Sequence, residues 1–119
     1  MVQKFWGKSA VIDLYGCNNR IKNPERIKEF IDRLCKRINM KKYGPLYLER
    51  FGEGKLEGYS CMQFIETSSI TAHFEEQQTP AKAFIDIFSC KDFDEKKALE
   101  FCRNFFRAKK TRLKTIIRK

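Results

Sequence analysis

Residues 59–75 read YSCMQFIETSSITAHFE and contain two strand candidates, 59–66 and 69–75, on either side of a short turn rich in hydroxyl groups. Both candidates are rich in β-branched and aromatic residues, as strands usually are. Similar segments lie at residues 46–51 and 83–89. Four consecutive strands without an intervening helix predict antiparallel pairing.

The flanking segments add one strand and one helix on each side. Apolar residues alternate through residues 9–15 and predict a first strand. Asn23 followed by Pro24 is typical of a helix start, with a capping side chain and proline at the first helical position. Residues 94–106 predict a second amphipathic helix, and residues 113–117 predict a final strand at a sheet edge. The apolar residues at helical spacing after Pro24 are Ile27, Phe30, Ile31, Leu34, Cys35 and Ile38.

The resulting order, β-α-β-β-β-β-α-β, predicts an α+β fold in which residues 1–119 form a single domain. Two helices can cover only one face of an antiparallel sheet, so we expect a two-layer sandwich. The uncovered face of that sheet is expected to be apolar enough to pack on a second sheet. The sequence therefore predicts a homodimer.

The formal charge of +10 is unevenly distributed along the chain. Residues 107–119 hold seven basic residues and no acidic one, whereas residues 56–81 hold four glutamates and no lysine or arginine. An acidic, hydroxyl-rich centre suits a small cationic ligand. The basic C-terminal segment is either a solvated edge or a surface for an anionic partner such as nucleic acid.

Several classes of protein are not expected. No apolar run approaches the roughly 20 residues that a membrane helix needs, and residues 1–7 lack the apolar stretch of a signal peptide. One histidine without ligand spacing argues against a metal site. The odd number of cysteines, with no CxxC pair, indicates reduced thiols and a cytoplasmic protein. These cysteines are Cys17, Cys35, Cys61, Cys90 and Cys102.

The turn at Ser68 suggests self-cleavage, because the only histidine, His73, follows five residues later. A serine beside a suitably oriented peptide bond can attack the preceding carbonyl and convert the amide to an ester. A base then removes the α-proton, and β-elimination leaves dehydroalanine, which hydrolyses to a pyruvoyl group and ammonia. Ser68 is the candidate nucleophile, His73 the base, and Ser60 or Ser69 a hydroxyl donor. Because Ser69, Thr71 and His73 share a strand face, we expect Ser68 in the turn itself.

A pyruvoyl group gives a small protein an electron sink without a bound cofactor. Its carbonyl forms a Schiff base with a substrate amine and accepts the electrons released when carbon dioxide leaves. Cys90, which follows the strand at 83–89, is the candidate proton donor to the resulting carbanion. The structural alternatives are a hydrogen-bonded His73 without a catalytic role and a buried Cys90 that acts as a small hydrophobe.

These residues resemble the small prokaryotic-type S-adenosylmethionine decarboxylase family. The matching segments are residues 13–17 (DLYGC), 68–73 (SSITAH) and 83–90 (AFIDIFSC), in the family's order and with its five-residue spacing from serine to histidine. The resemblance covers roughly residues 9–106. It implies an α+β sandwich, paired protomers, and pyruvoyl-dependent decarboxylation of S-adenosylmethionine in polyamine and spermidine synthesis.

The resemblance also implies a role for individual residues. Ser68 matches the serine that becomes the pyruvoyl group, Ser60 and His73 match residues that assist processing, and Cys90 matches the catalytic proton donor. An aromatic residue that stacks on adenine corresponds to Phe51. The predicted substrate-binding residues are Phe51, Asp13, Glu66, Thr67, Phe74 and Glu75.

The chain departs from the family pattern at two places, which leaves alternatives open. Thr67 stands where the family has glutamate before the cleaved bond, so attack by Ser69 on the carbonyl of Ser68 is an alternative register. Phe74 and Glu75 stand where the family often has tryptophan and an acidic residue, which leaves ornithine or arginine as alternative substrates. A non-cleaving homologue that binds a ligand or regulates a partner, and a small nucleic-acid-binding module, are the alternative functions.

Overall fold

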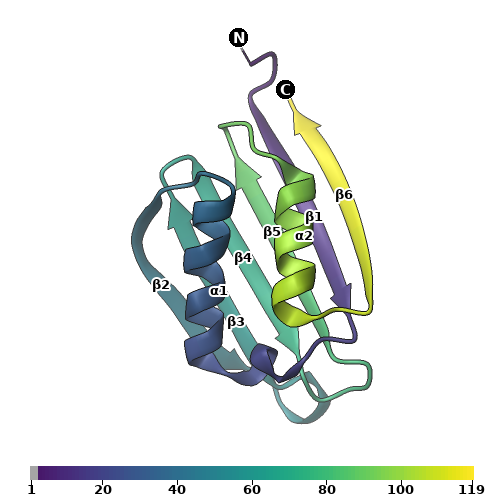
Figure 1. The fold of residues 1–119 in the computed structure, drawn as a ribbon. Helices are drawn as coiled ribbons and strands as arrows, with labels where there is room; N and C mark the ends of the chain where they lie inside the picture. Colours follow the sequence, from purple (N-terminus) through teal and green to yellow (C-terminus); the bar gives the residue numbers. More distant parts are fainter. Residues whose placement is uncertain (1–2) are drawn as a thin grey trace.

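The computed structural model describes residues 3–119 and contains six strands and two α-helices in the predicted order (Figure 1). Two short 3-10 helices, Asn19–Lys22 and Gly54–Leu56, lie in loops. The helices are α1 (Pro24–Arg37) and α2 (Glu95–Phe106). The strands are β1 (Gly7–Tyr15), β2 (Lys42–Phe51), β3 (Gly58–Ile65), β4 (Ser68–Glu75), β5 (Lys82–Ser89) and β6 (Lys110–Arg118).

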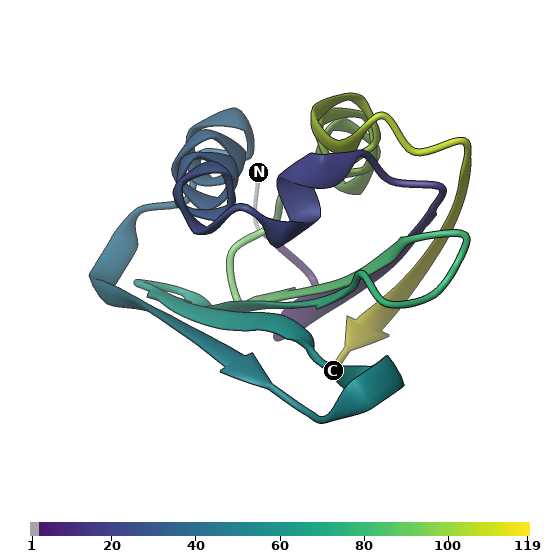
Figure 2. The ribbon, with the colours of Figure 1, turned by 90° about the horizontal axis from the view of Figure 1, so that it is seen from below.

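All six strands form one antiparallel sheet in the order β2-β3-β4-β5-β1-β6. Both helices pack on the same face of this sheet, as the end-on view shows (Figure 2). The predicted two-layer α+β sandwich is therefore confirmed. The last strand lies at a sheet edge, also as predicted.

Each helix begins where the sequence provides a capping side chain. The Asn23 side chain accepts hydrogen bonds from the backbone N–H groups of Glu25 and Arg26, and Pro24 occupies the first position of α1. Asp94 caps α2 in the same way. These side chains satisfy backbone donors that have no partner inside the helix.

The core lies between the helices and the sheet. Phe30 of α1 and Phe106 of α2 are fully buried, with ring centroids 4.7 Å apart. Phe74 of β4 reaches the same cluster, because its ring lies 5.5 Å from that of Phe106. Burial of these large rings stabilises the helix layer on the sheet.

Two strands, β2 and β6, extend furthest beyond the ranges that the sequence indicated. β2 begins at Lys42 rather than at residue 46, with a register shift between Lys42 and Leu46 and a positive φ of 75° at Gly44. β6 begins at Lys110 and pairs with β1 along its whole length. Pairing with a neighbouring strand stabilises extended backbone in polar segments whose own composition is a weak strand signal.

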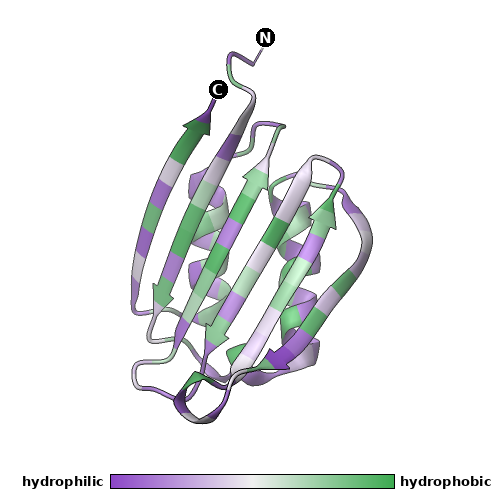
Figure 3. Cartoon of the chain, turned by 180° about the vertical axis from the view of Figure 1, so that it is seen from behind, coloured by the Kyte–Doolittle hydropathy of each residue, from purple (hydrophilic) through white to green (hydrophobic). Residues whose placement is uncertain are grey.

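Figure 3 views the sheet from the side opposite the helices and shows hydrophobic residues in every strand. The burial pattern of β4 alternates, with Ile70, Ala72 and Phe74 buried under the helices. The uncovered face is mixed, because polar residues such as Ser60, Thr71 and His73 lie among its apolar ones, so the prediction of an apolar face is correct only for part of it. Its exposed large apolar residues on β2 and β3 are Tyr47, Phe51, Met62 and Phe64. Within residues 3–119, neither helix is both long and apolar enough to span a membrane.

Candidate active site

A serine–histidine pair lies on the uncovered face of the sheet. Ser60 of β3 and His73 of β4 are direct cross-strand partners, and the Ser60 Oγ lies 2.8 Å from the His73 Nδ1. Directly opposed side chains of an antiparallel pair point to the same face, so the register of β3 and β4 produces this contact. The sequence predicted both residues at a site, and the structure brings them together.

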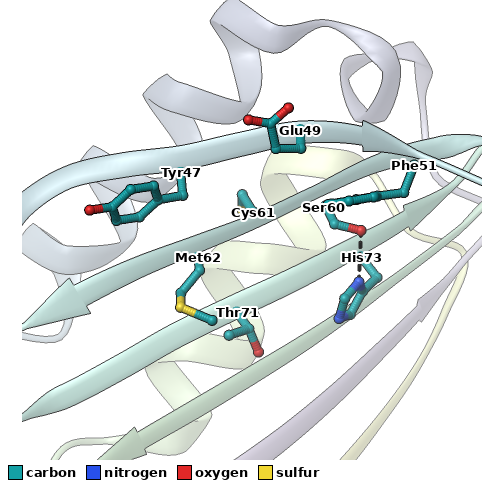
Figure 4. Close-up of a pocket in the computed structure, with 8 residues that line it drawn as sticks. All are labelled: Tyr47, Glu49, Phe51, Ser60, Cys61, Met62, Thr71 and His73. Atoms are coloured by element: carbon teal, nitrogen blue, oxygen red, sulfur yellow. Dashed lines mark hydrogen bonds between the residues drawn. The ribbon is translucent and has the colours of Figure 1, made fainter.

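The pair lines a pocket of about 310 Å³ formed by β2, β3 and β4 (Figure 4). Tyr47 and Phe51 supply aromatic walls, and Met62 and Thr71 lie beside them. The full lining consists of Tyr47, Glu49, Phe51, Ser60, Cys61, Met62, Thr71 and His73. Such a mixture of apolar walls and a few polar groups is typical of small-molecule sites.

The charges around this pocket favour a cation. Glu49 is the only residue in the lining with a formal charge when His73 is neutral, and no lysine or arginine is among them. Burial raises the pKa of the Cys61 thiol to about 12, so this side chain is a neutral thiol near pH 7. Aromatic faces and a carboxylate attract cations. No group of three histidine, cysteine or carboxylate side chains suited to a metal ion occurs in the described part of the chain.

Ser68 lies at the other end of β4. It is the first residue of that strand and pairs with both Ile65 and Ser89. The expectation that Ser68 lies in the turn is therefore wrong by one residue, because strand pairing extends to it. Its backbone is nevertheless irregular, with a φ of 154° that places it outside the usual regions for residues other than glycine. Such positions store strain of order 1–3 kcal/mol and are concentrated at functional sites.

The peptide bond before Ser68 is held by the end of β5. The backbone N–H of Cys90 donates a 2.9 Å hydrogen bond to the carbonyl oxygen of Thr67. The Thr67 Oγ1 lies 2.8 Å from the Ser89 Oγ, and it donates a weaker bond of 3.5 Å to the Met40 sulfur. Cys90 itself is exposed, which rules out its alternative interpretation as a buried small hydrophobe. We call Thr67, Ser68, Ser89 and Cys90 the cleavage cluster.

The cleavage cluster and the Ser60–His73 pair do not meet within one chain. Ser68 and His73 are five positions apart along an extended strand, which corresponds to roughly 16 Å at about 3.3 Å per residue. A histidine side chain does not span that distance. The short spacing in sequence suggested proximity, but an extended strand converts it into separation.

The remaining predicted substrate residues differ in their positions. Asp13 lies on the uncovered face two strands away from His73, with Phe84 of β5 between them in register. Glu66 lies in the turn before β4, and its carboxylate is 3.9 Å from the Lys41 ammonium. Neither residue lines the pocket.

Phe74 and Glu75 end β4 on opposite faces of the sheet. Phe74 is buried against Phe106, so the structure does not place it where it could contact a ligand on the uncovered face. Glu75 accepts a hydrogen bond from the backbone N–H of Gln77 and lies outside the pocket lining. The alternation of β4 explains this result, because Phe74 shares its face with the buried Ala72.

Sequence analysis missed five residues of the pocket: Cys61, which follows Ser60 directly, and four residues that share a strand face with a predicted site residue. Tyr47 and Glu49 precede Phe51 by four and two positions, Met62 follows Ser60 by two, and Thr71 precedes His73 by two. The strand period of two would have placed these four residues beside the predicted site residues. They were missed because the alternation of side chains was not followed along each strand from the predicted residue.

Comparisons with known proteins bear on the family and the fold of this chain. The chain matches the S-adenosylmethionine decarboxylase family model over residues 8–119. Two proteins named S-adenosylmethionine decarboxylase proenzyme, from Clostridium botulinum strains Langeland and Loch Maree, are 33% and 31% identical over 119 residues, which is 97% of this chain and 96% of each relative. The crystal structure of the adenosylmethionine decarboxylase from Aquifex aeolicus VF5 superposes with a TM-score of 0.78 over 98% of this chain and 92% of that one. Its sequence identity of 22% means that this likeness shows the fold alone.

Proposed function

This chain belongs to the S-adenosylmethionine decarboxylase family, and we propose that it makes its pyruvoyl group from Ser68. Members of the family are pyruvoyl-dependent carboxy-lyases of polyamine biosynthesis, made as proenzymes. The pyruvoyl group supplies the electron sink for loss of carbon dioxide. The side chains of the protein then have three tasks: to generate that group, to hold the substrate, and to return a proton.

Self-cleavage begins at the Thr67–Ser68 bond. The Ser68 Oγ attacks the Thr67 carbonyl carbon, the C–N bond breaks, and an ester links the two residues. A base removes the Ser68 α-proton, and the Cβ–O bond then breaks to leave a Thr67 carboxylate and dehydroalanine. Addition of water and loss of ammonia yield the pyruvoyl end. The Cys90 N–H is in position to stabilise the negative charge that develops on the Thr67 oxygen during the attack.

The base for this reaction comes from a second copy of the chain in our proposal. Ser68 and His73 lie at opposite ends of β4, and Met62 and Phe64 of the adjacent β3 are exposed apolar residues on the uncovered face beside them. Two sheets packed face to face by a two-fold axis that reverses the strand direction would bring the His73 end of one copy to the Ser68 end of the other. The homodimer would thus contain two complete sites, each built from both chains.

The pocket around His73 supports a sulfonium substrate. S-adenosylmethionine has a cationic sulfur and an aromatic adenine, and the pocket offers Glu49 and the rings of Tyr47 and Phe51. Stacking of adenine on Phe51 agrees with the role that the sequence resemblance implied. Asp13 lies on the same sheet face, outside the pocket lining, and is available to contact the amino group of a substrate that extends beyond the pocket.

The hydrogen bond from Cys90 to Thr67 is the observation that carries the proposal, because it joins the predicted proton donor to the predicted cleavage bond. Release of labelled carbon dioxide tests the reaction, with S-adenosylmethionine, ornithine and arginine as separate carboxyl-labelled substrates. We expect turnover of S-adenosylmethionine alone. Release from ornithine or arginine instead would transfer the assignment to the alternative substrates. An intact, inactive chain would favour the non-cleaving alternative.

A further inference from the structure

The turn that follows β5 holds both functional groups of Cys90, its backbone N–H and its thiol. Its backbone is bonded on both sides: the Cys90 N–H is directed at Thr67, and the Lys91 N–H donates to the Ser89 Oγ at 3.0 Å. The backbone N–H of Phe93 donates a hydrogen bond of 2.9 Å to the carboxylate of Asp92. These hydrogen bonds within the turn do not involve the carbonyl oxygen of Cys90 or the N–H of Asp92.

Gln3, from the segment before β1, bonds to both of these groups. Its Nε2 donates to the Cys90 carbonyl oxygen at 2.6 Å, and its Oε1 accepts from the Asp92 N–H at 2.9 Å. One side-chain amide therefore bridges the residues on either side of Lys91. The N-terminal segment and the end of β5 lie at the same end of the molecule in Figure 1.

Lys8 of β1 holds the same loop from the buried side. Its ammonium contacts the Asp92 and Glu95 carboxylates, each at 2.7 Å, and donates to the Phe93 carbonyl oxygen at 2.5 Å. It also lies over the Phe93 ring, 4.8 Å from the centroid. Lys8 is only 6% exposed, and three bonds from a buried ammonium fix the loop relative to β1.

We propose that Gln3 and Lys8 are positioning residues for Cys90. They hold the Cys90–Asp92 turn so that the N–H of Cys90 is directed at the Thr67 carbonyl and its thiol stays at one place beside the cleavage bond. This inference rests on the proposed function for its effect on catalysis. We call the contacts of Gln3 and Lys8 with this turn the clamp. The clamp is a property of the fold and can be measured without catalysis.

Gln3→Ala is the sharper test, because Gln3 is exposed and its loss leaves the core intact. Lys4→Ala is the matched control, since Lys4 is exposed in the same segment and has no side-chain hydrogen bond or ion pair within residues 3–119. We expect Gln3→Ala to slow both self-cleavage and the kcat of the cleaved enzyme by roughly three- to tenfold at an unchanged melting temperature, because two hydrogen bonds that orient the reacting groups are lost. KM should stay within about twofold, because Gln3 is not among the residues that line the substrate pocket.

A second readout does not depend on cleavage. In Gln3→Ala, the backbone N–H groups of Cys90 and Asp92 should exchange with deuterium roughly tenfold faster than in the wild type and in Lys4→Ala, and alkylation of the Cys90 thiol by iodoacetamide should change in rate. The experiment uses the full chain and measures Lys8→Met in parallel. That variant removes the ammonium but keeps the apolar stem.

The two readouts separate the failure of this inference from that of the proposed function. Wild-type exchange, alkylation, cleavage and kcat in Gln3→Ala would overturn the positioning role, whatever the chain catalyses. Faster exchange without any effect on cleavage or kcat would show that Gln3 has only a structural role, and this result would also overturn the positioning role. If the wild-type chain never cleaves, the proposed function fails, and exchange and alkylation still decide whether the clamp exists.

Discussion

The backbone N–H of Cys90 lies 2.9 Å from the carbonyl oxygen of Thr67 in the uncleaved chain. A donor is thus already in place on the carbonyl that Ser68 would attack, and the following residue has the strained φ of 154°. Preorganised donors lower the barrier of acyl transfer because they require no reorganisation as charge develops. The neighbouring side chains make the arrangement testable.

Thr67→Val should slow self-cleavage. The substitution keeps the β-branched shape but removes the hydroxyl that bonds to Ser89, and the loss of one hydrogen bond of about 1 kcal/mol corresponds to a rate roughly fivefold lower. Thr67→Ser retains the hydroxyl and should cleave at nearly the wild-type rate. The rate constant for appearance of the fragments on denaturing gels gives the comparison. Equal rates for the valine and serine variants would show that this hydroxyl has no part in cleavage.

Cys90→Ala should separate the two functions of that residue. Alanine keeps the backbone N–H, so self-cleavage should continue, whereas loss of a proton donor should reduce decarboxylation by about 10²- to 10⁴-fold. Both quantities come from one preparation, by quantifying fragments and carbon dioxide release per cleaved chain. A folded Cys90→Ala protein that decarboxylates at the wild-type rate would exclude the thiol as the donor.

Mixed chains test the two-chain site. Ser68→Ala lacks the nucleophile and His73→Ala lacks the base, so neither should cleave alone. When the two are co-expressed, the Ser68→Ala chain supplies His73 to the intact Ser68 of its partner, and the His73→Ala chain should be cleaved. Fragments from His73→Ala, identified by mass, are the expected result. Absence of fragments in dimers that contain both chains would argue for a site within one chain.

The Lys8 ion pairs should make stability depend on pH at both extremes. Burial lowers the pKa of Lys8, but its bonds to Asp92 and Glu95 outweigh burial and raise that pKa above the ordinary value of 10.5. The same bonds lower the pKa of both carboxyl groups. The carboxyl contribution to stability is therefore present above about pH 4 and is lost as the pH falls through the lowered values, whereas the Lys8 contribution is lost as the pH rises above 10.5.

Lys8→Met should consequently flatten the curve of melting temperature against pH on both sides while lowering its plateau. Thermal unfolding of both proteins from about pH 2 to 11 provides the measurement. Parallel curves, with the same losses at acid and alkaline pH, would mean that other groups control the pH dependence.

Local signals in the sequence predicted most of the fold. Asn23 and Pro24 mark the start of α1 because capping depends only on neighbouring backbone. The first residues of β2 escaped prediction because Lys42 is held in the sheet by Ile65, a contact that composition does not reveal. Pairing between distant segments can override a weak local preference.

The candidate site was predicted as a set of residues but not as a geometry. The motif gave Ser60, Ser68, His73 and Cys90, and the structure joins them as Ser60 with His73 and Ser68 with the segment before Cys90. The five-residue spacing from Ser68 to His73 could not reveal their separation until the intervening residues were known to be extended. Gln3 was beyond reach, because 87 residues separate it from Cys90 and its polar side chain has no distinctive pattern.

Intact mass measurement under denaturing conditions tests the source of the pyruvoyl group most directly. For the wild type and for Ser69→Ala, we expect two fragments, residues 1–67 and 68–119, whose summed mass equals that of the intact chain plus one water minus one ammonia. Ser68→Ala should give the intact chain alone. Cleavage in Ser68→Ala, or its loss in Ser69→Ala with fragments shifted by one residue in the wild type, would contradict the assignment of Ser68.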